Sequence, residues 1–134
     1  MKTISHTNPD GTVVAVTLGD NVTLGNYVRL GNYVRLGNRV TLGDDVCLGN
    51  YVRLDDNVTD ACDGGTERER GYARAYALHP TRGVLIGAGC RIFTLTEARA
   101  HWGSADYPDR ARGDGYLRWL DYVEADARAR GWIA

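Results

Sequence analysis

The tripeptide Tyr-Val-Arg occurs at residues 27–29, 33–35 and 51–53, and the last two copies lie 18 residues apart. The planar guanidinium of arginine matches the geometry of phosphate and carboxylate groups, and a tyrosine ring can stack on a planar base. These types are suited to binding an anionic, nucleotide-like molecule. The predicted ligand-binding residues are Tyr33, Arg35, Tyr51 and Arg53.

Residues for acid–base or metal chemistry are sparse. The histidines are His6, His79 and His101, and none lies in the repeats described below. A three-histidine metal site would need such residues at stacking distance. His79, before Pro80 in a predicted turn, is the one candidate general base, and an ordinary exposed turn residue is the alternative. No catalytic residue, metal site or cofactor is predicted.

A six-residue repeat must position the tyrosines and arginines. Val recurs every sixth residue from Val16 to Val58, and Leu from Leu18 to Leu54, mostly followed by Gly and then Asn or Asp. Val-x-Leu places both apolar side chains on one side of a short strand. Gly and Asn or Asp accept the tight turn that follows. Three such units are expected to close a triangular coil, so that residues 18 apart stack.

Stacking would bring Arg35 and Arg53 within about 5 Å of each other in neighbouring strands, where like charges repel. An acidic group of another subunit, an anionic ligand or splaying into water could offset this repulsion. The same surface is therefore open to three interpretations: a subunit interface, a ligand contact or a plain solvated face. The first two can coexist.

The unit Leu30–Arg35 fits every constrained position of a known pattern: aliphatic, then a small or acidic residue, two free positions, a small or β-branched residue and one free position. It resembles the hexapeptide-repeat superfamily of trimeric, acyltransferase-like proteins. The resemblance implies a left-handed parallel β-helix, a homotrimer and ligand sites in clefts between subunits. The whole chain is similar to small members encoded by phages and prophages, which implies no settled activity.

The repeat ends near residue 65, and two regions are predicted: a β-helix over 1–65 and a hairpin with a helical cap or oligomerisation segment over 66–134. The turn-rich stretch 60–66 is expected to be a linker, and the hairpin to join 71–78 to 84–86. Residues 86–91 match the repeat again, which predicts an inward-pointing Cys90.

Two helices are expected at the C-terminal end of the chain. Thr94 and Glu97 have the spacing of a capping box, which predicts a helix through about Trp102. A second helix is expected near 109–130. The predicted fold class is therefore mainly β: a short left-handed parallel β-helix followed by a hairpin and two C-terminal helices.

Composition limits the partners and the compartment. The 134 residues carry a net charge of −1, which argues against nucleic acid and anionic membranes as partners. The three cysteines include no C-x-x-C pair, which argues against a disulfide framework and favours the cytoplasm. The N-terminus lacks the apolar run of a signal peptide.

Three functions are compatible with the sequence. The first is a non-enzymatic homotrimer that sequesters a small anionic, nucleotide-like ligand at Arg/Tyr clefts between subunits, as a phage anti-defence protein would. The second is a hexapeptide acyltransferase with His79 as its base. The third is a purely structural trimeric assembly module.

Overall fold

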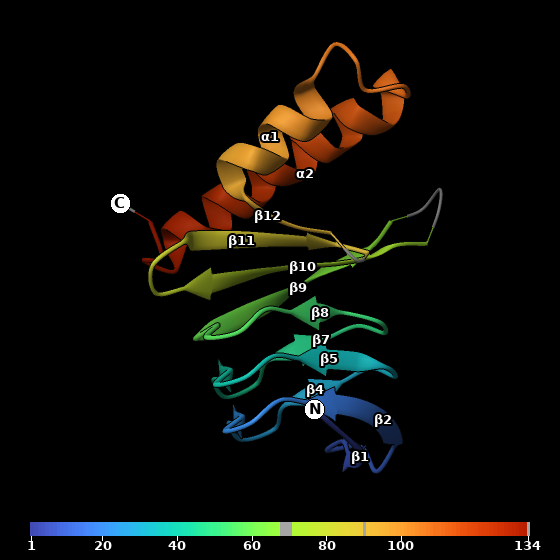
Figure 1. The fold of residues 1–134 in the computed structure, drawn as a ribbon, viewed down its shortest axis with the longest axis vertical. Helices are drawn as coiled ribbons and strands as arrows, with labels where there is room; N and C mark the ends of the chain where they lie inside the picture. Colours follow the sequence, from blue (N-terminus) through green and yellow to red (C-terminus); the bar gives the residue numbers. More distant parts are fainter. Residues whose placement is uncertain (68–70, 90, 134) are drawn as a thin grey trace.

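The computed structural model describes residues 1–67, 71–89 and 91–133. The repeats stack at one end, a broader sheet crosses their far end, and two helices cover the outer side of that sheet (Figure 1). The strands are β1 (Lys2–Thr7), β2 (Val13–Leu18), β3 (Thr23–Leu24), β4 (Arg29–Leu30), β5 (Val34–Leu36), β6 (Thr41–Leu42), β7 (Cys47–Leu48), β8 (Arg53–Leu54), β9 (Asp60–Thr66), β10 (Ala73–His79), β11 (Gly83–Ala88) and β12 (Arg91–Thr94). The helices are α1 (Leu95–Gly103) and α2 (Arg110–Ala129).

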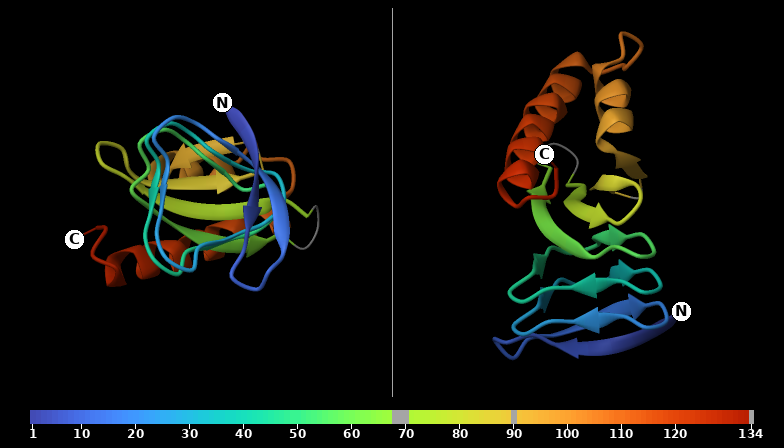
Figure 2. Two further views of the ribbon diagram at one scale, coloured as in Figure 1. Left: turned by 90° about the horizontal axis from the view of Figure 1, so that it is seen from below. Right: turned by 90° about the vertical axis from the view of Figure 1, so that its left-hand side faces the viewer.

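The short strands of the repeats pair in parallel with the strand 18 residues further along. β2 pairs with β5 and β5 with β8, while β3 pairs with β6 and β4 with β7. Seen from below in Figure 2, successive repeats nearly superpose as three-sided loops. Val34 and Leu36 are completely buried, as are most of the other Val and Leu residues of the repeat. This apolar interior fixes which side chains of each strand face outward.

The corners between these strands are tight because each repeat lies directly on the next. A Cβ on Gly25 would lie 2.6 Å from the carbonyl carbon of Gly43, so only glycine fits there. The backbone N–H of Asn32 donates to Oδ1 of Asn50 at 2.8 Å, and equivalent bonds recur at the other corners. The Gly-Asn/Asp pair of each repeat thus makes the turn and bonds it to its neighbour.

The N-terminal segment closes the first open end of the repeats. Strand β1 pairs antiparallel with β2. Asn8 is buried, and its side chain accepts from the N–H of Leu30 and donates to the carbonyl of the same residue, both at 2.9 Å. The sequence patterns did not predict this closing strand.

A four-stranded antiparallel sheet, in the order β12-β11-β10-β9, closes the other end. Its two faces follow the alternation of side chains along a strand. Ala75 and Ala77 of β10 and Leu85 of β11 join the Val/Leu core of the repeats. Tyr76 and Ile86 point to the opposite face and pack with the helices. The sheet therefore joins the repeat core to the helical core.

Both helices begin at their predicted N-terminal signals. Thr94 and Glu97 form the capping box that starts α1, and the Asp109 side chain caps α2 by accepting from the N–H of Arg112. Trp102 of α1 and Tyr116 of α2 stack face to face, with ring centroids 4.0 Å apart. Within the described ranges, no helix has both the length and the apolar character needed to cross a membrane.

The predicted fold class is wrong. The described part of the chain is a mixed fold, with 38% of its residues in strands and 22% in helices, rather than a mainly β solenoid with a small appendage. The repeat strands are only two or three residues long beyond β2, so they form separate small sheets. The expected hairpin is one part of the four-stranded sheet, which joins it to β9 and β12.

The expected linker over 60–66 is also wrong, because this stretch is strand β9. Its glycines suggested a turn, but Gly64 has a packing role. A Cβ there would lie 2.5 Å from a ring carbon of Trp119 and 2.9 Å from the backbone of Arg74. The orientation predicted for Cys90 concerns a residue outside the described ranges.

Candidate functional site

The four predicted ligand-binding residues lie together on one outer face of the repeats. Arg35 of β5 is the direct neighbour of Arg53 of β8 in the parallel register. The rings of Tyr33 and Tyr51 stack, with centroids 5.3 Å apart and planes inclined by 22°. They border a hollow of about 410 Å³, which we call the Tyr/Arg groove. Its lining residues are Tyr33, Arg35, Tyr51, Arg53, Gly71, Tyr72, Ala73 and Gly89.

The local backbone turns both tyrosines outward. Tyr33 and Tyr51 adopt φ angles of 62° and 65°, in the left-handed region. The valines that follow them, Val34 and Val52, point into the core, so that the next side chains, Arg35 and Arg53, face solvent again. The corner and the alternation of the strand thus place an aromatic ring beside a guanidinium in each repeat.

The two arginines of the groove have no carboxylate partner among the residues that the structure describes. Six other arginines do form ion pairs there: Arg29, Arg82, Arg99, Arg110, Arg112 and Arg130. Arg35 and Arg53 therefore present two adjacent positive charges to the groove. An anion bound between them would offset their mutual repulsion.

Tyr72 forms the upper wall of the groove, and the sequence patterns missed it because it lies outside the repeats. Its side chain is half-exposed. Gly89 has a φ of 60°, and a Cβ on it would lie 3.5 Å from the Tyr72 ring. The guanidinium carbon of Arg112 lies 5.1 Å from the centroid of the same ring. Tyr72 is thereby held against helix α2.

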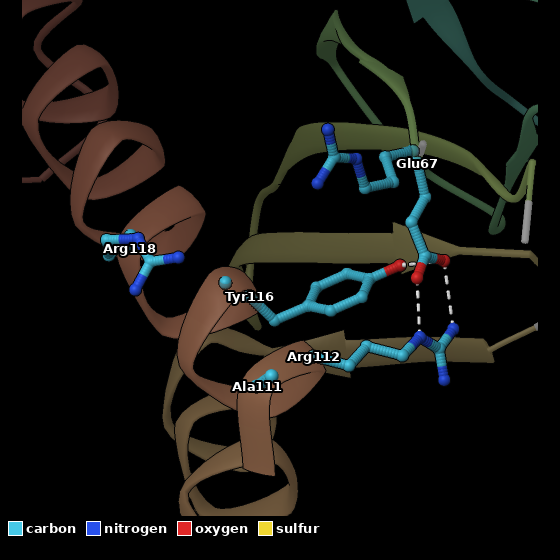
Figure 3. Close-up of a pocket in the computed structure, with 7 residues that line it drawn as sticks. Glu67, Ala111, Arg112, Tyr116 and Arg118 are labelled. Carbon is cyan, nitrogen blue, oxygen red and sulfur yellow. Dashed lines mark hydrogen bonds and ion pairs between the residues drawn. The ribbon is translucent and has the colours of Figure 1, made fainter. Parts of the chain in front are cut away.

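Arg112 is itself fixed by a buried ion pair with Glu67 (Figure 3). Its Nη2 donates to Oε2 of Glu67 at 2.9 Å and its Nε donates to Oε1, so the contact is bidentate. The hydroxyl of Tyr116 donates to the same Oε2 at 3.0 Å. Hydrogen bonds from Arg112 hold the pKa of the Glu67 carboxyl below its ordinary value, despite burial. This network connects the segment after β9 to α2.

The histidines lie elsewhere and have structural contacts. Nδ1 of His79 accepts backbone hydrogen bonds from Thr81 at 3.2 Å and Arg82 at 3.1 Å, which stabilises the β10–β11 turn. That turn lies at the opposite end of β10 from the groove residue Ala73. His101 stacks on Phe93 at 5.1 Å, and burial lowers its pKa.

Cys47 and Cys62 are free thiols in the described part of the chain. Burial raises the pKa of the Cys62 thiol, which lowers the fraction of reactive thiolate. No group of three His, Cys, Asp or Glu side chains in the described ranges is arranged to hold a metal ion. The Tyr/Arg groove is thus the candidate site, with binding rather than covalent chemistry as its evident capacity.

Comparison of the chain with protein-family models, with curated proteins and with solved structures gives no match. The side-chain geometry therefore carries the functional conclusion.

Proposed function

We propose that the protein is a non-enzymatic binding protein whose Tyr/Arg groove takes a small anionic, nucleotide-like ligand. The observation that carries this proposal is the placement of Arg35 beside Arg53, next to two stacked tyrosines, without a carboxylate partner in the described ranges. The two guanidiniums would donate to phosphate oxygens. The tyrosine rings would offer a face to a planar base.

The size of the groove supports the same ligand class. Its volume of about 410 Å³ lies within the usual range for small-molecule sites, about 300–1,000 Å³. The glycines at its upper end, Gly71 and Gly89, leave room beside the ring of Tyr72. A mononucleotide could therefore place its base against the tyrosines and its phosphates near the arginines.

Backbone strain at the tyrosines supports a binding role as well. The equivalent corner position holds Asn21, Asp45 and Asn57 in other repeats, and these types tolerate positive φ well. A tyrosine in this conformation costs about 1–2 kcal/mol. Residues kept in such conformations concentrate at functional sites. The choice of Tyr at residues 33 and 51 is consistent with a role that Asn cannot fill.

We extend the proposal to a cytoplasmic homotrimer in which a neighbouring subunit covers the open side of the groove. Tyr27, Tyr33 and Tyr51 are 74%, 61% and 64% exposed, which leaves aromatic surface for a second copy to cover. In the phage setting, such a trimer would sequester a nucleotide-type host signal. Native mass spectrometry would report the number of subunits, and a monomer at micromolar concentration would contradict this extension.

The acyltransferase alternative has less support. Its candidate base, His79, already accepts two backbone hydrogen bonds through Nδ1 and sits in the turn at the far end of β10 from the groove. The His79→Ala variant is expected to bind ligand as the wild type does. Release of a free thiol from acetyl-coenzyme A by the wild type would favour the enzyme instead.

Isothermal titration calorimetry with ADP, AMP and adenosine tests the proposed function. We expect saturable binding of ADP, weaker binding of uncharged adenosine, and at least a tenfold loss of ADP affinity in the double variant Arg35→Gln/Arg53→Gln. Arg29→Gln is a matched control, because Arg29 belongs to the third Tyr-Val-Arg copy but lies on the β4–β7 face. Equal affinity in the double variant and the control would remove the groove as the site.

A further inference from the structure

A second hollow lies over helix α2, on the other side of the Glu67–Arg112 pair (Figure 3). Its volume is about 230 Å³. Its lining residues are Glu67, Arg74, Ala111, Arg112, Gly115, Tyr116 and Arg118. Three of these carry a positive charge and one a negative charge, which leaves an excess of two positive charges around the hollow.

The one acidic group of this hollow is already fully engaged. Both carboxylate oxygens of Glu67 accept hydrogen bonds from Arg112, and one also accepts from the hydroxyl of Tyr116. The Glu67 side chain is 8% exposed. Glu67 therefore neutralises Arg112, and no carboxylate in the lining remains for Arg74 or Arg118.

Arg74 is held in place by contacts that leave its charge available. Its guanidinium carbon lies 4.8 Å from the ring centroid of Trp119 and 5.6 Å from that of Tyr116. Its Nε donates to the carbonyl of Gly65 at 3.3 Å. None of these partners is an anion. A guanidinium ordered in this way loses less conformational entropy when it binds a ligand.

Arg118 stands on the other side of Tyr116 from the Glu67–Arg112 pair (Figure 3). The neighbouring acids of α2 bind elsewhere: Asp114 pairs with Arg110, and Asp121 and Glu124 pair with Arg99. Arg118 has no carboxylate partner within the described ranges. Between the two arginines, Ala111 and Gly115 present small side chains that let an anion approach the helix surface.

We propose that this hollow is a second anion-binding site, which takes a phosphate group between Arg74 and Arg118. The matching geometry of guanidinium and phosphate favours a phosphate over a halide. The site shares no lining residue with the Tyr/Arg groove, so it is independent of the proposed function. Inorganic phosphate or the phosphate of a monoester would bind in the same way.

The test uses the full chain with the Arg35→Gln/Arg53→Gln substitutions, so that the groove cannot contribute. Inorganic phosphate and glycerol 3-phosphate are titrated at constant ionic strength, and the arginine Nε–Hε and tryptophan Nε1–H resonances are followed by NMR. We expect saturable shifts of Arg74 and Trp119. Arg118→Gln in this background is expected to weaken binding at least fivefold, and Arg82→Gln, a distant surface control, to leave it unchanged.

Two results would overturn the proposal. The first is the absence of saturable shifts with either compound. The second is equal phosphate affinity in the Arg118→Gln and Arg82→Gln proteins. Stronger shifts with glycerol 3-phosphate would identify a monoester as the preferred source of the phosphate, and equal shifts would indicate that the phosphate group alone is recognised. Arg118 is exposed, so its substitution should leave the fold intact.

Discussion

Glu67 and Arg112 lie 45 residues apart in the sequence and form a bidentate ion pair with side chains only 8% and 10% exposed. The pair joins the segment after β9 to helix α2 and places the Arg112 guanidinium against Tyr72 in the wall of the groove. A contact on the helical side of the sheet thus supports the surface proposed to bind ligand.

Arg112→Gln should lower the free energy of unfolding by about 3 kcal/mol, because it leaves a buried carboxylate without its charged partner. Urea denaturation followed by far-UV circular dichroism measures the change. Arg82→Gln is the control, since the Arg82–Asp55 pair is exposed and such pairs contribute about 0–1 kcal/mol. Equal losses in the two variants would show that the buried pair has no special structural weight.

The same pair predicts how stability depends on pH. The pKa of Glu67 is lower in the folded protein than its ordinary value of 4.5, so the unfolded state binds more protons in the acidic range. Its contribution is therefore complete above about pH 5 and is lost as the pH falls through the folded pKa. Glu67→Gln should flatten the fall of unfolding free energy between pH 5 and 3, as measured by urea titrations at each pH.

Other carboxyl groups also have lowered pKa values, so the comparison with Glu67→Gln is needed to isolate this one. They are Asp10, Glu97 and Asp126. If wild type and Glu67→Gln lose stability in parallel over this pH range, Glu67 is not the group responsible.

Two glycine substitutions should act in opposite directions. Gly64→Ala places a Cβ 2.5 Å from the Trp119 ring and should cost about 1–3 kcal/mol through overpacking. Gly115→Ala, inside α2, meets only the end of the Arg118 side chain at 3.8 Å and should gain about 0.8 kcal/mol. Thermal unfolding of both variants checks the signs. A stable Gly64→Ala protein would contradict the close packing of β9 beneath α2.

The strained corners predict that stability and binding separate. Tyr27→Asn should raise the unfolding free energy by about 1 kcal/mol, because Asn tolerates the positive φ of 58° better, and ADP binding should not change. Tyr51→Asn gains the same relief but loses the stack on Tyr33, so its stability should change little while ADP affinity falls. Equal ADP affinities in the two variants would exclude Tyr51 from the site.

The sequence predicted the local neighbours within the repeats and both helix starts. The 18-residue spacing placed Arg35 beside Arg53 and Tyr33 beside Tyr51, and the strand register and ring stacking confirm both. A strict repeat makes such neighbours predictable, because every unit must bury the same Val and Leu. The capping residue Thr94 likewise acts within its own turn.

The features that were missed depend on contacts between distant segments. Gly64 suggested a turn, and only its packing under Trp119 explains a strand there. Tyr72 acquires its place in the groove from Arg112, 40 residues later in the chain. The fold class was wrong for the same reason: the repeat pattern dominates the sequence, while the four-stranded sheet and the helices are defined by their mutual packing.

The most direct test of the Tyr/Arg groove is an NMR titration of the protein, with assigned arginine Nε–Hε resonances, with ADP. The account predicts that Arg35 and Arg53 shift together along one saturable curve, while Arg29, in the same tripeptide on another face, stays in place. Saturable ADP binding that leaves the Arg35 and Arg53 resonances unmoved would contradict it.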